Sequence, residues 1–118
     1  VIRVGNLSAK RDFTDVRDVV GAYTRLMELG ATGETYNVGS GSAVAIRDVL
    51  DRILKLTDME IRVETDPERL RPVDIPVIEA DITKLLRCTG WRREISLDQT
   101  LQETLEHWRK RTRGDLLL

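Results

Sequence analysis

The sequence has little cysteine, and no long apolar run. Cys88 is the single cysteine, so the chain cannot form an internal disulfide or build a zinc site by itself. No apolar run approaches the roughly 18 residues of a membrane-spanning helix. The net charge of −1 gives no electrostatic case for binding nucleic acid or a membrane. No secretory signal is recognisable, and the sequence therefore predicts a cytoplasmic protein without metal, nucleic-acid or membrane partners.

The composition is that of an ordinary folded domain. The 118 residues are 41% apolar and 33% charged, which is typical of a globular chain and sufficient for one core. We therefore predict a single domain over residues 1–118. The chain begins Val-Ile-Arg-Val without a methionine, in what looks like the middle of a strand, so we expect a fragment of a longer protein.

Hydrophobic periodicity predicts an α/β layered fold with few short strands and about four helices. Strands are expected at 1–4, 34–38 and 60–64, with a short extended stretch at 77–80. Helices are expected at 16–27, 46–54, 82–87 and 97–108, and residues 5–14 and 66–76 read as loops. In the last helix we expect Leu97, Leu101, Leu105 and Trp108 to face inward, after a capping-box pattern that begins at Ser96.

The turn Gly39-Ser40-Gly41 lies between an expected strand and an expected helix, as in dinucleotide-binding loops. That fingerprint requires a third glycine or an alanine three residues later, where this sequence has Val44. An acidic residue about 20 positions on is available at 60 or 64, but one is expected there by chance. The pattern therefore favours an ordinary turn over a phosphate cradle.

A first basic loop contains Lys10 and Arg11 just before a predicted helix. An arginine there can reach an anion while its apolar stem packs against the chain. The alternative is a surface ion pair of Arg11 with Asp12 or Asp15, which would contribute little to stability. Both interpretations stay open on chemistry alone, and the ion pair is the simpler one.

A second basic loop contains Arg69, Arg71 and Asp74 among the three prolines of the chain. Pro72 biases Arg71 toward an extended backbone, so the loop can present its charges at low ordering cost. Arginine pairs bidentately with phosphate, and an aspartate can accept from a ribose hydroxyl. Here too the alternative is a solvent-exposed ion pair, of Arg71 with Asp74 or with Asp66.

Four segments together resemble a known family: VGNLSAKRDFTDVRDVVGAY, GETYNVGSG, RLRPVDIPVIEADITKLLRCTGW and ISLDQTLQETLEHWR. They resemble the C-terminal part of extended short-chain dehydrogenases that act on nucleotide sugars, most closely the GDP-mannose 4,6-dehydratases and the GDP-4-keto-6-deoxymannose reductases. In such enzymes a Rossmann half binds NAD or NADP and a smaller C-terminal half binds the sugar nucleotide.

The catalytic half of the family has no counterpart in this sequence. A Tyr-x-x-x-Lys pair is missing, because Tyr23 is followed by Met27 and Tyr36 by Ser40. The resemblance thus implies a substrate-binding domain without catalytic or cofactor-binding residues. NADP or NAD would be bound by the full-length enzyme only, and the fragment alone would be inactive.

The resemblance also implies roles for individual residues. It places Arg11 and Arg71 at the substrate diphosphate and Asp74 at the ribose. Asn6 would line the nucleotide pocket, and Lys10 and Arg69 are further candidates. The implied partner is a GDP-sugar, and surfaces meant for a missing half would favour a homo-oligomer.

The implied reaction of the whole enzyme is hydride transfer from the sugar C4 to NADP⁺, loss of water across C5–C6, and return of the hydride to C6. A reductase would instead deliver hydride to a C4 ketone. The stretch DFTDV after Arg11 leans toward the reductase branch, while the dehydratase stays the first interpretation. Other nucleotide-sugar epimerases, and a stand-alone module that binds a ligand without catalysis, are the alternatives.

Overall fold

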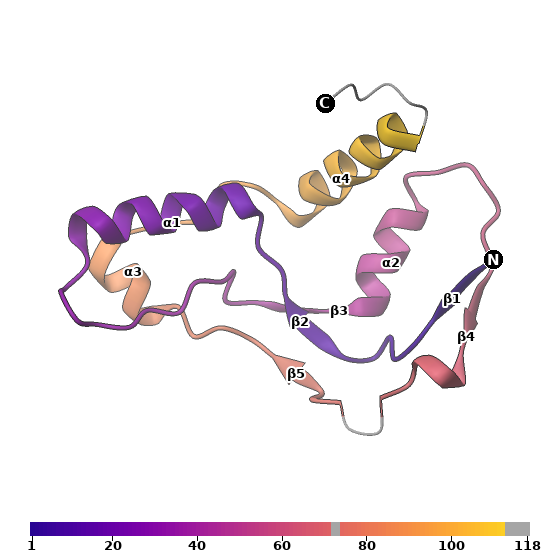
Figure 1. Cartoon of the computed structure of the whole chain (residues 1–118), viewed down its shortest axis with the longest axis horizontal. Coiled ribbons are helices and arrows are strands. Elements are labelled where there is room, and N and C mark those ends of the chain that lie inside the picture. The colour runs from indigo at the N-terminus through magenta and orange to yellow at the C-terminus, as the bar shows by residue number, and fades with distance from the viewer. Residues whose placement is uncertain (72–73, 113–118) are drawn as a thin grey trace.

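The computed structural model describes residues 1–71 and 74–112 as an α/β fold, as the sequence predicts. Its elements follow the chain as mixed short strands and helices (Figure 1). The strands are β1 (Ile2–Val4), β2 (Lys10–Asp12), β3 (Ala43–Ala45), β4 (Val63–Thr65) and β5 (Val77–Ile78). The helices are α1 (Val16–Leu29), α2 (Ile46–Leu54), α3 (Thr83–Thr89) and α4 (Leu97–Thr112), with a 3-10 turn at Pro67–Arg69.

The strands form two small sheets. β1 pairs in parallel with β4, and β2 lies between β3 and β5, antiparallel to the first and parallel to the second. The expectation of a loop throughout residues 5–14 is wrong, because β2 lies inside it. Its sequence, Lys-Arg-Asp, has neither apolar alternation nor strong strand propensity. Pairing with two strands that are distant in sequence makes it the centre of a sheet.

The expected strand at 34–38 is absent from the described part of the chain. This segment has no ladder partner there, and its groups bind locally instead. The Tyr36 hydroxyl accepts from the N–H of Ala31, and Lys84 of α3 donates to the carbonyl of Thr35. The strand that does follow, β3, comes after the glycine turn and runs directly into α2, so a strand separates this turn from its helix.

The four predicted helices are all present, and three of them have a cap or a stop signal at one end. Asp15 caps α1 by accepting from the N–H of Arg17, Gly90 ends α3 with φ of 63°, and Ser96 accepts from the N–H of Gln99 at the start of α4. In the part of the chain that the structure describes, no helix combines the length and the apolar character needed to cross a membrane.

The core is small and lies between α1 and α3. Ala22 of α1, Leu85 of α3 and Trp91 are buried together. Asp18 is also buried. Its carboxylate accepts from the N–H groups of Glu94 and Ile95 and so fixes the segment that leads to α4. The inner face of α1 is therefore partly polar.

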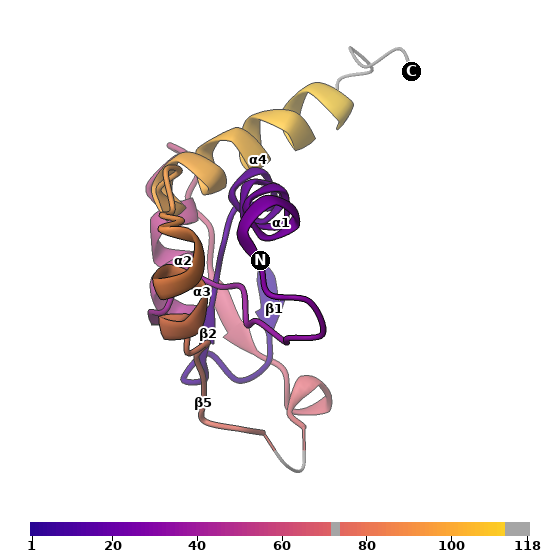
Figure 2. The same ribbon diagram turned by 90° about the vertical axis from the view of Figure 1, so that its left-hand side faces the viewer.

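The opposite face of α1 carries an exposed row of apolar side chains, which we call the α1 stripe: Val16, Val20, Tyr23 and Met27. These positions follow helical spacing, and Met27 is 88% exposed. The molecule is open and shallow (Figure 2): its radius of gyration is 17.5 Å and its shortest extent 23 Å. A compact chain of this length has a radius of about 13–14 Å.

The expectation that Trp108 faces inward is wrong. Leu97, Leu101 and Leu105 are half-buried, as predicted, but Trp108 is 54% exposed. At this level of α4 it is Arg109 that reaches the chain just after α2, donating to the carbonyl of Leu56. Trp108 instead contacts the guanidinium of Arg111 on its own helix.

Candidate functional site

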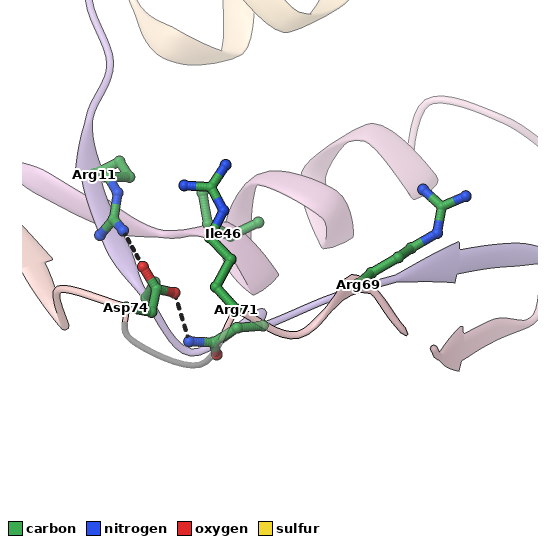
Figure 3. Close-up of a pocket in the computed structure, with 7 residues that line it drawn as sticks. Arg11, Ile46, Arg69, Arg71 and Asp74 are labelled. Carbon is green, nitrogen blue, oxygen red and sulfur yellow. Dashed lines mark hydrogen bonds and ion pairs between the residues drawn. The ribbon is translucent and has the colours of Figure 1, made fainter. Parts of the chain in front are cut away.

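A hollow of about 240 Å³ brings together residues from both basic loops (Figure 3). Three arginines and one aspartate give its wall an excess of positive charge, which suits an anion. The volume is below the roughly 300–1,000 Å³ of pockets that enclose a whole small molecule, so the hollow is too small to enclose one. Its lining consists of Asn6, Ala9, Arg11, Ile46, Arg69, Arg71 and Asp74.

The backbone brings the two loops together at the ends of β1 and β4. The N–H of Asp66 donates to the carbonyl of Val4, which extends the pairing of these strands by one bond. Gly5 then allows a close approach, because a Cβ atom there would lie only 2.5 Å from the carbonyl oxygen of Arg69. The chain after β4 therefore passes directly beside the chain after β1, where Asn6 lies.

Arg11 and Asp74 form a half-buried ion pair at the centre of the wall. Arg11 Nη2 lies 2.7 Å from Asp74 Oδ1, and the two side chains are 26% and 21% exposed. Arg11 Nη1 also donates to the carbonyls of Lys10 and Ile75. Among described partners, three of the five N–H donors of this guanidinium are used. Two are left for an incoming acceptor.

Asn6 completes this network from the other side. Its Nδ2 donates to Asp74 Oδ2 over 2.8 Å, and its Oδ1 accepts from the N–H and the hydroxyl of Ser8. Both oxygens of Asp74 are thus held by the protein, each with further acceptor capacity. The result is a carboxylate fixed in place beside a fixed guanidinium.

Arg71 differs from Arg11 in having no hydrogen bond or ion pair to any residue of the described ranges. Figure 3 shows its side chain rising in front of Ile46, whereas Arg69 points away from the ion pair. Arg69 contacts Asp66 at 3.3 Å. Pro72, which we expected to restrict Arg71, lies outside the described residues.

Lys10 is the one candidate that does not line the hollow. It is exposed and precedes Arg11 on β2, so its side chain leaves the strand on the opposite face. Its role in binding stays a prediction. The sequence left open a surface pair of Arg11 with Asp12 or Asp15, and the structure pairs it with Asp74 instead.

Sequence reasoning missed the apolar part of the wall. Ala9 and Ile46 line the hollow, and Ile46 is the first residue of α2, so the positive end of that helix lies at the site. The N–H groups of Ile46 and Arg47 are already bonded, to the carbonyls of Ala9 and Leu7. Nothing in the apolar pattern distinguishes these residues from core positions.

The glycine turn holds a different anion from the one its pattern suggested. The N–H groups of Ser40 and Gly41 donate to the carboxylate of Asp12, over 2.8 Å and 3.0 Å. The turn thus binds a carboxylate of its own chain. A dinucleotide phosphate would have to displace that carboxylate, so these residues do not fit a cofactor site.

Fold and hollow together define an α/β chain with an excess of positive charge around one small cavity. Comparison with known proteins identifies its family. The family model for GDP-mannose 4,6 dehydratase matches residues 1–104. A GDP-6-deoxy-D-mannose reductase from Pseudomonas aeruginosa is 35% identical over 97% of this chain. A probable UDP-arabinose 4-epimerase from Arabidopsis thaliana is 30% identical over 92%. The chain spans 38% and 26% of the length of these two relatives.

Solved structures show the same relationship. The structure of RMD from Pseudomonas aeruginosa complexed with NADPH superposes with a TM-score of 0.86 at 33% identity, over 93% of this chain and 36% of that one. A putative epimerase from Burkholderia cenocepacia gives 0.85 at 36% identity, over 92% and 36%. The chain belongs to the GDP-mannose 4,6-dehydratase family, within the extended short-chain dehydrogenases.

Proposed function

We propose that this chain is the nucleotide-sugar-binding domain of an NAD(P)-dependent enzyme of the GDP-mannose 4,6-dehydratase type, and that its hollow binds the diphosphate of a GDP-sugar. The observation that carries the proposal is that Arg11 and Arg71, from loops 60 positions apart, line one small hollow with Asp74. Two guanidinium groups around one cavity match the paired charges of a diphosphate.

Each residue contributes a distinct contact in this proposal. Arg11 donates to one phosphate through the N–H groups that the ion pair leaves over, and Arg71 turns its exposed guanidinium onto the other. Asp74, fixed by Arg11 and Asn6, accepts from a ribose hydroxyl. The chain thereby holds and orients the substrate, while the hollow has no serine, cysteine or histidine among its described lining residues.

The cofactor of the whole enzyme is part of the proposal, although the glycine turn is not free to hold it. The turn amides of Ser40 and Gly41 bind Asp12, as shown above. NAD or NADP, when bound elsewhere in the whole enzyme, would supply hydride transfer to and from the sugar. We propose that this chain alone binds neither and has no activity.

A reductase is the second candidate for the whole enzyme. It is favoured by the identity of 35% to a GDP-6-deoxy-D-mannose reductase over nearly the whole chain. Whole enzyme incubated with GDP-mannose and catalytic NADP⁺ should release water and form a 4-keto-6-deoxy sugar if it is a dehydratase. Consumption of NADPH with that keto sugar, and no reaction with GDP-mannose, would identify the reductase.

Calorimetry on the chain itself tests the binding proposal. GDP and GDP-mannose should bind, and GMP, which lacks the second phosphate, should bind at least tenfold more weakly. UDP serves to measure the preference for the base. Equal affinity for GDP and GMP, or no heat with any of these ligands, would overturn the proposed diphosphate site.

We also propose that the protein self-associates through the α1 stripe. Contiguous exposed apolar residues on one helix face favour contact with another apolar surface. The open shape of the chain, described above, leaves this face uncovered by the described residues. A second copy of the chain can cover the α1 stripe by pairing the two helices.

A further inference from the structure

Asp12 lies next to Arg11 on β2, but on the other face of the strand. Successive side chains of a strand point to opposite sides. Arg11 accordingly faces the hollow, and Asp12 faces the glycine turn. Asp12 does not line the hollow and cannot contact a ligand there.

The Asp12 carboxylate joins three separate segments of the chain. It accepts from the N–H groups of Ser40 and Gly41 in the turn before β3, and from the N–H of Ala80 after β5, over 3.2 Å. The hydroxyl of Thr14 approaches to 3.4 Å. Asp12 therefore fixes the end of β2 to both neighbouring strands of its sheet.

This arrangement requires an ionised carboxylate in a tight space. Partial burial raises the pKa of Asp12, but hydrogen bonds from Ser40, Ala80 and Gly41 outweigh that effect and leave the pKa below its usual value. A Cβ atom on Gly39 would lie 2.9 Å from Asp12 Oδ2 and 2.6 Å from the Cβ of Ala80. The Asp12 carboxylate therefore lies close against the backbone of Gly39, where any side chain at position 39 would collide with it.

The position of β5 relative to β2 decides whether Arg11 meets its partners. Arg11 donates to the carbonyl of Ile75 and to Asp74, which lie just before β5, while Asp12 holds Ala80 just after it. The ladder between the two strands has only two residue pairs. In so short a ladder, the side-chain hydrogen bonds at its two ends therefore contribute strongly to the alignment of β2 with β5.

We propose that Asp12 is a positioning residue for the anion-binding hollow: it aligns β2 with the turn and with β5, and so sets the distance between Arg11 and Asp74. This inference rests on the proposed function. It also assigns a role to the Gly39-Ser40-Gly41 turn: its N–H groups hold Asp12 and thereby keep β2, which carries Arg11, in position.

The test is a double-mutant cycle measured by GDP calorimetry on the chain, well below the melting temperature. Asp12→Asn keeps the size but loses the charge and one acceptor, and should weaken GDP binding about five- to tenfold, within the range of couplings in one network. In an Arg11→Met background the same change should have no further effect, because Asp12 acts through Arg11.

Asp81→Asn is the matched control, since Asp81 also accepts a backbone N–H, from Thr83, but lies outside the β2 contacts. It should bind GDP like wild type. Unchanged affinity of Asp12→Asn would overturn the positioning role. An equal loss of affinity in both backgrounds would also overturn it, because such a loss indicates a general loss of structure. Failure of wild type to bind GDP would instead refute the proposed function.

Asp12→Glu keeps the inference testable if Asp12→Asn does not fold. It retains the charge, but the extra methylene displaces the carboxylate from the position where it accepts from Ser40, Gly41 and Ala80. It should give a folded chain, with a normal far-ultraviolet circular dichroism spectrum, that binds GDP several-fold more weakly. Wild-type affinity in this variant would overturn the proposal.

Discussion

Replacing Arg71 by alanine should weaken GDP binding without lowering the free energy of unfolding. Arg71 is exposed and has no hydrogen bond or ion pair to the described residues, so its removal breaks no contact of the fold. Surface substitutions of this kind usually change stability by less than about 0.5 kcal/mol. Any loss of affinity would therefore come from the ligand contact itself.

The size of that loss follows from the exposure of the site. Hydrogen bonds to charged groups contribute about 1.5–3 kcal/mol, and an exposed guanidinium belongs at the lower end. A loss of about 1.5 kcal/mol raises the dissociation constant roughly tenfold. The effect should shrink as salt is added, because ions screen an exposed charge pair.

Arg69→Ala is the matched control, because it removes a neighbouring arginine whose side chain points away from the ion pair (Figure 3). Isothermal titration with GDP and thermal unfolding of both variants give the comparison. Equal weakening by the two substitutions would refute the reasoning, since it would mean that overall positive charge, and not the placement of Arg71, attracts the ligand. Wild-type affinity of Arg71→Ala would refute it as well.

Three further outcomes are expected. Leu85→Ala, at a fully buried core position, should cost about 2–5 kcal/mol in thermal or urea unfolding, and Leu86→Ala, 40% exposed on the same helix, should cost far less. Hydrogen bonds from Arg17 lower the pKa of Asp15, so its contribution to stability is present above the ordinary pKa of 3.8 and is lost below it; melting temperatures that stay constant down to pH 2 would contradict this. Met27→Glu should shift the particle mass in light scattering from dimer toward monomer, and a wild-type chain that is already monomeric would refute association through the α1 stripe.

The helices could be predicted from the sequence because their signals are local. The cap at Asp15 and the stop at Gly90 act within one turn of their own helix. Strands depend on partners instead. Residues 34–38 have strand propensity but form no strand, because they have no ladder partner in the described chain. The charged residues of β2 do form a strand, because two distant segments pair with them.

The site was predictable to a different degree at each residue. From the residues alone, Arg11 could contact an anion or form a surface ion pair. Only the resemblance to a family favoured the anion contact. The structure adds that the ion pair is with Asp74, a partner 63 positions away that no local pattern indicates. The turn amides around Asp12 were equally hidden, because their acceptor lies 28 positions earlier in the chain.

The pairing of Arg11 with Asp74 also has a consequence for folding. The contact closes a loop of 63 residues, and the entropy cost of such a closure is roughly 4 kcal/mol. The hollow is therefore complete only after most of the chain has reached its final place, and no shorter peptide from either basic loop should reproduce it. Ligand binding then reports on the whole fold: at 100 times the dissociation constant, a ligand adds about 2.7 kcal/mol to the stability of the entire domain.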